Sequence, residues 1–206
     1  MKRVLYIVPA VVLVGSVAFS QPPATTTPAT TTGGTPQTGG QKIGLSTSLK
    51  NGYNNFKRNF TAAAEKMPEA DYTFKPGSTP EARTYTQVIA HIVQSQFGQC
   101  SNLTGQPNPM QGKQLEQELK TKAEVSKALA DSFAMCDKAF DAVTDANATE
   151  MVRQGQNEVT RAAAMYGLIV HGNELYGTAA VYLRSKNIVP PSTENAGRGM
   201  RGRGNQ

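Results

Sequence analysis

The sequence predicts an all-α protein, a four-helix bundle with a long crossover after the first helix. Four stretches of about 20 residues within residues 44–193 carry apolar side chains at intervals of three, four and seven, the spacing of one face of an α-helix. No convincing alternation with a period of two, which would indicate half-buried strands, occurs among them. About 150 residues are enough to enclose a proper core, so we expect a single domain.

The first 20 residues have the features of a secretory signal peptide. Met1-Lys2-Arg3 is a positively charged start, residues 4–19 are a mostly apolar run, and Ala18-Phe19-Ser20 is a small-x-small cleavage site. The run is shorter than the roughly 18 to 20 apolar residues that a spanning helix prefers. We therefore expect export, to the periplasm or out of the cell, with a retained N-terminal membrane anchor as the alternative.

Two segments of low complexity flank the predicted domain. Residues 21–43 are rich in threonine, proline and glycine, and up to Gln41 they hold no charge and no bulky apolar side chain. Residues 194–206 are rich in arginine and glycine. Neither segment has the apolar surface to offset the entropy of ordering its chain, so we predict a disordered linker and a disordered tail.

The formal charge of +6 belongs to the two ends of the chain. Six basic residues lie outside residues 44–197, and that segment holds 15 basic and 15 acidic residues. A basic binding face is therefore not supported, and an exported protein meets little RNA, so we do not expect nucleic-acid binding by the arginine-rich tail. We expect the partner to be a small molecule or an envelope component, and the sequence leaves a homodimer open.

The first helix is predicted over Leu45–Met67, where the apolar side chains repeat at helical spacing. Pro68 ends it, because proline cannot continue the hydrogen-bond ladder. Glu69–Arg83 contains two prolines and a glycine, which is typical of a connection. It is long enough to cross from one end of the bundle to the other, and we expect Tyr72 and Phe74 to pin it to the domain.

Capping boxes mark the starts of the next two helices. The spacing Thr84-x-x-Gln87 predicts a helix over Tyr85–Leu103. The same spacing from Thr121 opens a third helix, whose apolar residues continue to Val143.

Turns separate the third helix from its neighbours. Residues 113–120 are predicted to be a polar turn before it, and Asp145–Arg153 a turn after it. The fourth helix begins near Glu158 and ends near Asn187, because Pro190 and Pro191 prevent its continuation.

Cys100 and Cys136 lie on the apolar faces of the second and third helices. In an oxidising compartment they can pair, and the loop so closed is worth roughly 3 to 4 kcal/mol on the chain-entropy model. Two buried free thiols are the alternative, and the spacing does not decide between them. Cys100 follows His91 by nine residues, about half a turn out of phase, so we do not expect the two to share a metal site.

The chain contains two histidines, His91 and His171. Steps of three and four from His171 meet an apolar stripe, so we expect its side chain to point into a core or a cavity. The stripe is Ala164, Leu168, Leu175, Ala179 and Tyr182.

One histidine on each of two helices can form part of a metal site inside a bundle. Catalytic zinc normally takes three protein ligands, and Leu175 occupies the easiest place for the third, one turn after His171. Glu174 is the candidate for an oxygen ligand or a general base. The alternative is that both histidines are hydrogen-bonded core residues and Glu174 is solvated.

Two stretches of the chain resemble the DinB-like four-helix bundles, in their secreted branch. They are FKRNFTAAAEKMPEADYTFKPGSTPEARTYTQVIAHIVQSQFGQC, residues 56–100, and HGNELYGTAAVYLRSKNIVPPST, residues 171–193. The resemblance extends over about residues 45–193 and implies the fold of that family. In the family a metal, commonly zinc or nickel, is held by one histidine on the second helix and two spaced by four on the last. His91 and His171 match two of these positions, and Leu175 stands at the third.

The resemblance implies two functions of different class. The first is an exported metal-dependent hydrolase or thiol transferase with a degraded triad and weak or absent catalysis, its zinc or nickel held by His91, His171 and Glu174. The second is a non-catalytic envelope module, for binding or for structure, that has lost the metal and needs no cofactor.

Overall fold

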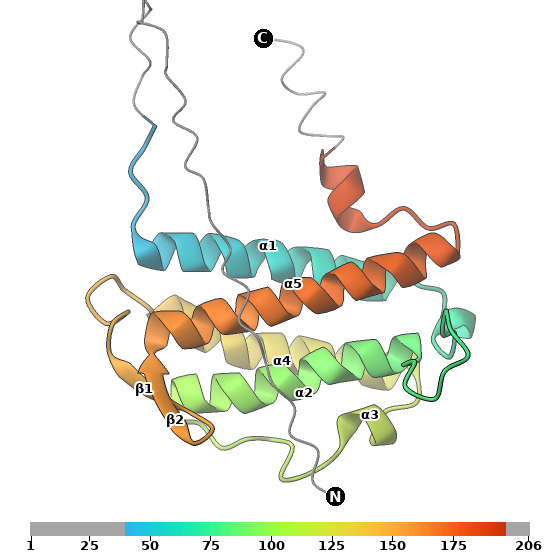
Figure 1. Ribbon diagram of the computed structural model, residues 1–206, viewed down its shortest axis with the longest axis horizontal. Helices are drawn as coiled ribbons and strands as arrows, with labels where there is room; N and C mark the ends of the chain where they lie inside the picture. The colour runs from blue at the N-terminus through green and yellow to red at the C-terminus, as the bar shows by residue number, and fades with distance from the viewer. Residues whose placement is uncertain (1–39, 197–206) are drawn as a thin grey trace, which may run out of the picture. The chain divides into compact units, whose positions relative to one another are not determined.

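The structure, a computed structural model, describes residues 40–196. The predicted signal peptide, nearly all of the predicted linker and the end of the predicted tail lie outside the described residues. Four long helices form the domain (Figure 1), and the predicted all-α bundle is confirmed. These helices are α1 (Leu45–Lys66), α2 (Tyr85–Thr104), α4 (Lys122–Ala142) and α5 (Arg161–Ser185). Among residues 40–196, no helix combines the length and the apolarity needed to cross a membrane.

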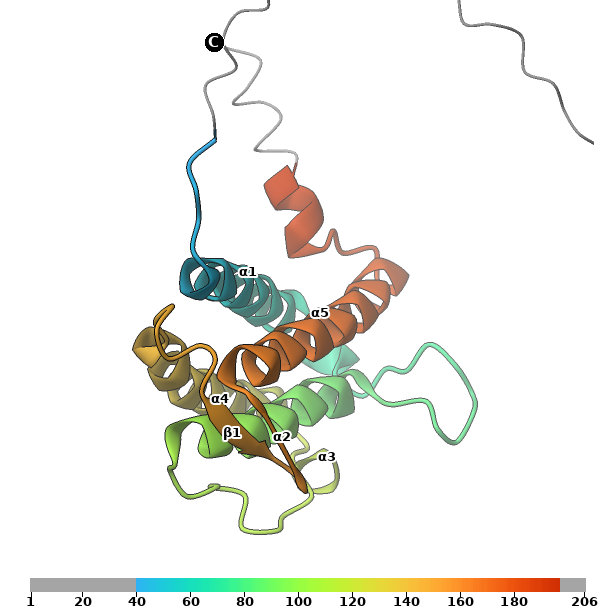
Figure 2. The ribbon, with the colours of Figure 1, turned by 60° about the vertical axis from the view of Figure 1, so that its left-hand side comes forward.

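Each long helix packs against two others (Figure 2). Both α1 and α2 contact α4 and α5, and α1 and α2 lie at opposite corners of the bundle. Aromatic side chains fill the space between them. Tyr53 of α1 stacks on Phe140 of α4 with ring centroids 3.9 Å apart, and Phe56 contacts both Phe60 and Phe133. The phenol of Tyr53 donates to Asp137 at 2.8 Å, which also ties α1 to α4.

The capping boxes predicted for α2 and α4 are both formed. Thr84 and Thr121 each accept a hydrogen bond from the backbone of the residue three positions on, and in both cases the side chain at that position bonds back. The α1 start is capped from a distance, since Asp145 accepts from the amide of Ser46 at 2.7 Å. That bond holds the end of α4 against the start of α1.

The crossover between the two ends of the bundle is not where the sequence predicted it. The Tyr85 hydroxyl donates to the carbonyl of Ala63, so α2 begins at the end of the bundle where α1 finishes. Residues 67–84 therefore leave and return at one end, and the short helix η1 (Glu69–Asp71) lies within them. Tyr72 pins this connection as expected, because it is buried and donates to the carbonyl of Ala64.

The segment that does run from end to end is residues 105–121, between α2 and α4 (Figure 1). Lys122, the first residue of α4, donates to the carbonyls of Glu65 and Met67, which places the start of α4 beside the end of α1. The crossover contains the short helix α3 (Leu115–Glu118), where only a polar turn was predicted. The buried side chain of Leu115 docks this turn of helix on the domain.

A β-hairpin replaces part of the turn predicted before the last helix. Strands β1 (Met151–Gln154) and β2 (Asn157–Thr160) pair antiparallel, and Gly155 takes a positive φ of 62° between them. The prediction was wrong here because strands of four residues are too short to show an alternating pattern, and Val152 alone is buried in β1. As a result α5 begins at Arg161, later than the predicted Glu158.

Glycine at position 172 is required by the packing of α5 on α1. A Cβ added there would lie 2.6 to 2.8 Å from the ring of the buried Phe56. We expect Gly172→Ala to lower the free energy of unfolding by about 1 to 3 kcal/mol, the usual effect of overpacking. Gly98→Ala on α2 is the matched control, since its Cβ would meet nothing within 4 Å, and it should stabilise by about 0.5 to 1 kcal/mol. Urea unfolding of both variants measures the difference, and a loss of equal size in both would refute the packing argument.

Candidate functional site

The two histidines meet between α2 and α5. Their ring centroids are 5.4 Å apart, with the planes inclined at 72°. Both imidazoles are partly exposed, so they lie at the edge of the core rather than inside it. His171 was expected to point into a core or cavity, whereas the rest of its stripe on α5 is buried and the histidine itself reaches the margin.

His91 is held by a carboxylate from the crossover. Its Nδ1 lies 2.5 Å from Glu116 Oε1, and because an ionised carboxylate can only accept, Nδ1 is the donor. The guanidinium of Arg83 bonds the same carboxylate, with Nε 2.7 Å from Oε2. Burial alone would raise the pKa of Glu116, but the hydrogen bonds from Arg83 and His91 outweigh it and hold that pKa below its usual value. Glu116 is therefore the charged centre of this part of the site.

Sequence reasoning missed Glu116. It stands 25 residues from His91, in the segment interpreted as a polar turn. The signal that could have found it is the apolar pair Leu115 and Leu119, spaced by one helical turn among polar residues. The amide of Leu115 also donates to the Gln94 side chain, which fixes α3 against α2 close to His91.

His171 is held from two sides. Its Nε2 lies 3.3 Å from the Ser95 hydroxyl, and its Nδ1 lies 3.3 Å from Glu174 Oε2. Ser95 follows His91 by one helical turn, so α2 presents both side chains to α5. Glu174 is largely exposed and bonds His171 from the solvent side.

Serine, histidine and carboxylate in this order are also the groups of an acyl-transfer triad. Such chemistry needs preorganised donors for the oxyanion. Ser95 lies in the middle of α2, where the backbone N–H groups are used by the helix itself. The backbone around Ser95 therefore supplies no donor for an oxyanion.

The residues present do not complete a metal site. Leu175, at the third ligand position, is buried and has no donor atom. Glu174 contacts Nδ1 of His171 at 3.3 Å and is largely exposed to solvent. Within residues 40–196 no group of three or more histidine, cysteine, aspartate or glutamate side chains is placed to hold a metal ion. In that part of the chain, the two histidines lie together, and no third side chain of these types is placed to share a metal ion with both.

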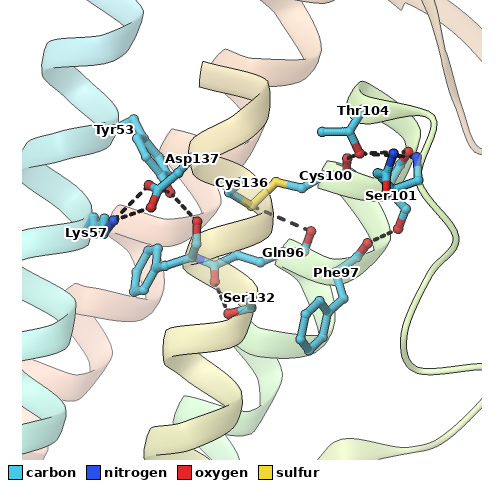
Figure 3. The surroundings of a disulfide bond; sticks show 12 residues. Tyr53, Lys57, Gln96, Phe97, Cys100, Ser101, Thr104, Ser132, Cys136 and Asp137 are labelled. Carbon is cyan, nitrogen blue, oxygen red and sulfur yellow. Dashed lines mark hydrogen bonds and ion pairs between the residues drawn. A yellow bond between two sulfur atoms is a disulfide. The ribbon is translucent and has the colours of Figure 1, made fainter. Parts of the chain in front are cut away.

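The two cysteines are joined in a disulfide between α2 and α4 (Figure 3). The Cα atoms of Cys100 and Cys136 are 5.1 Å apart, and both side chains are fully buried. Beside the bond, the Gln96 side chain accepts from Ser132, so polar and covalent links between the two helices lie together. The sulfur atoms are occupied by each other and contribute nothing to the histidine site.

Glu116 should make the stability of the protein depend on pH in acid. Because its pKa is lowered in the folded state, its ion pairs stabilise the fold above the ordinary glutamate pKa of about 4.3, and this is lost as the pH falls through the folded-state value. We expect the melting temperature of Glu116→Gln to fall less steeply than that of the wild type between about pH 5 and pH 3. Glu118→Gln, an exposed position on the same helix, is the control and should keep the wild-type slope. Parallel slopes for all three proteins would show that Glu116 carries no such stabilisation.

Comparison with known families gives a match to the DinB superfamily. The family model aligns with residues 55–179, more than half of the chain. No curated protein matches the sequence.

Solved structures of low sequence identity have a similar fold. A DinB-like protein from Bacillus cereus ATCC 10987 has a TM-score of 0.56 at 13% identity, over 69% of this chain and 93% of that one. A DinB-like protein from Bacillus subtilis has a TM-score of 0.54 at 16% identity, over 68% of this chain and 92% of that one. A mutant of the mycothiol-dependent maleylpyruvate isomerase has a TM-score of 0.50 at 15% identity, over 65% of this chain and 61% of that one. At these identities the likeness shows the fold alone.

Proposed function

Because the chain belongs to the DinB superfamily, we propose that it is an exported DinB-like domain with an incomplete metal triad and weak or absent catalysis. One observation carries the proposal. The position of the third ligand is filled by the buried side chain of Leu175, one turn after His171. A hydrolase or thiol transferase that depends on a metal would need a donor atom there.

The contacts of the two histidines support a structural role for them. His91 joins α2 to α3 through Glu116, and His171 joins α5 to α2 through Ser95. Each imidazole thereby satisfies part of its hydrogen-bonding capacity within the protein. These hydrogen bonds and ion pairs support a role for the two histidines that needs no metal.

The second candidate function is a binding module for a small molecule or an envelope component. A pocket of about 170 Å³ beside α3 favours it, because its lining combines hydroxyl groups with the charged side chains of Glu116 and Lys120. Glu116 also belongs to the histidine cluster, so a ligand in this pocket would contact the same charge network. The volume suits a molecule smaller than a typical drug-sized ligand.

Thermal unfolding in the presence of Zn²⁺ tests the incomplete triad. A metal that binds the folded state raises the melting temperature in proportion to the logarithm of its concentration over the dissociation constant. We expect the wild type and His171→Ala to show the same shift on addition of zinc, since His171 is not part of a complete site. A shift in the wild type that His171→Ala abolishes would contradict the proposal.

The export proposal is tested by the mass of the mature chain. Cleavage after Ser20 would leave Gln21 as the first residue, whereas a retained anchor would keep Met1. We expect intact-mass analysis of the protein from its native envelope to give the shorter chain. The full-length mass in the membrane fraction would favour the anchor.

A further inference from the structure

The pocket of about 170 Å³ beside α3 is formed by three segments of the chain. The start of α2 lines one side, the end of α3 and the residues after it line another, and the connection that follows α1 completes the wall. The buried side chains of Tyr72 and Leu115 dock the last two segments on the domain. The walls of the pocket are therefore fixed by the fold itself.

Part of the lining is apolar. The side chain of Leu119 is partly buried and packs against the core. Thr73, Thr84 and Thr86 each bring a methyl group to the wall, and Thr86 is only 4% exposed. A hydrocarbon group placed against these side chains would remove apolar surface from water, which favours binding.

The polar groups of the lining are mostly donors that are still available. Within residues 40–196 the Thr73 hydroxyl, Gln87 Nε2 and Lys120 Nζ have no hydrogen-bond partner. The Thr84 hydroxyl accepts from the amide of Gln87, so its own proton is also available. The Thr86 hydroxyl is the exception in this lining, because it donates to a backbone carbonyl at 2.9 Å. A ligand in the pocket therefore has to bring acceptors.

The charges of the lining leave one cation without a counterion. The carboxylate of Glu116 already has Arg83 Nε 2.7 Å from Oε2 and His91 Nδ1 2.5 Å from Oε1. Lys120 forms no ion pair in the described part of the chain. The carboxylate of Glu124 is engaged at the start of α4, where it accepts from two backbone amides at 3.0 Å each. An anionic group in the pocket would supply the missing partner of Lys120.

An alkyl carboxylate matches both parts of this lining. Its ionised head only accepts hydrogen bonds and has the charge opposite to that of Lys120. The volume suits a molecule smaller than a typical drug-sized ligand. We propose that the pocket binds a short-chain carboxylate, with its head at Lys120 and Gln87 and its alkyl chain on Leu119. The inference rests on the second candidate function, the binding of a small molecule, and names the class of that molecule.

An NMR titration of the isotope-labelled full chain with butanoate tests the proposal. Butanoate should shift the amide signals of Thr73, Gln87 and Lys120 saturably, with a dissociation constant in the millimolar range that is usual for so small a ligand. Butylammonium has the same alkyl chain and the opposite charge, and should give no saturable shift of these signals. Inorganic phosphate brings acceptors without a hydrocarbon group, and should bind more weakly than butanoate.

Two variants test the contacts of the carboxylate head. Lys120→Met removes the ammonium group and should weaken butanoate binding by at least about 10-fold, the usual effect of losing a hydrogen bond to a charged group. Thr73→Val removes a hydroxyl at nearly constant volume and should weaken it by about 2- to 10-fold. Lys113→Met is the matched control, since Lys113 is an exposed lysine of the same crossover outside the pocket lining, and it should keep the wild-type affinity.

The failure of this inference differs from the failure of the candidate function. Equal butanoate affinity in Lys120→Met and the wild type would overturn the carboxylate, as would saturable binding of butylammonium or an equally tight binding of phosphate in the pocket. Each of these results would leave the pocket as a binding site. If none of the three compounds shifts the pocket amides saturably up to about 100 mM, the second candidate function is itself overturned.

Discussion

Replacing Leu175 by histidine should raise the affinity of the protein for Zn²⁺ by about 100-fold or more, because the change supplies the missing third ligand. His91 and His171 already lie with their ring centroids 5.4 Å apart. Each also has its Nδ1 against a carboxylate, Glu116 for one and Glu174 for the other, which is how outer-shell partners orient metal-ligating imidazoles. Isothermal titration of the variant and the wild type with zinc and nickel measures the gain.

Two further variants separate ligation from other effects of the change. Leu175→Ala removes the same side chain without adding a donor, and should bind zinc as weakly as the wild type. Adding Glu116→Gln to Leu175→His should lower the gained affinity by about 10- to 100-fold, the usual effect of losing an outer-shell partner. An unchanged affinity in a folded Leu175→His protein would mean that the imidazoles cannot serve one ion.

Removing the disulfide should lower the free energy of unfolding by about 3 to 4 kcal/mol. The bond between Cys100 and Cys136 joins residues 36 apart, and a loop of that length restricts the unfolded chain by about this amount on the chain-entropy model. Both side chains are fully buried, and alanine at the two positions removes the bond without introducing a polar group into the core. Urea unfolding of Cys100→Ala/Cys136→Ala beside the wild type measures the difference.

Reduction provides the control for this variant. Dithiothreitol should lower the stability of the wild type toward that of the double variant, and should leave the double variant unchanged. Equal stability of the oxidised wild type and the double variant would show that the bond does not constrain the unfolded state.

Local signals in the sequence were sufficient for the starts of α2 and α4 and for the end of α1. Thr84 and Thr121 mark the starts of α2 and α4 because a capping box acts within four residues. Pro68 marks the end of α1 for an equally local reason. The hairpin at Met151–Thr160 was missed because its two strands are short and half-exposed. Neither strand shows an alternation of apolar and polar residues that would predict it, and the strands are held by pairing with each other.

The candidate site could be predicted only in part. Spacing placed His171 on one helix and His91 on another, and the family resemblance suggested that they meet. Glu116 could not be predicted in the same way, since it reaches His91 through the crossover of residues 105–121, whose path depends on tertiary packing. The sequence predicts the crossover after α1 because Glu69–Arg83 is long enough to span the bundle. The length of a segment does not show its path, and here the hydrogen bond from Tyr85 to Ala63 returns the chain to the end of the bundle where α1 finishes.

The metal content of the purified protein tests the central claim most directly. The chain should be prepared without a histidine tag and without chelator, and analysed for zinc and nickel beside His171→Ala. An incomplete triad predicts far less than one metal ion per chain in both proteins. Near-stoichiometric zinc or nickel in the wild type, lost in His171→Ala, would contradict it and would show that His171 ligates a metal in a working DinB-like site.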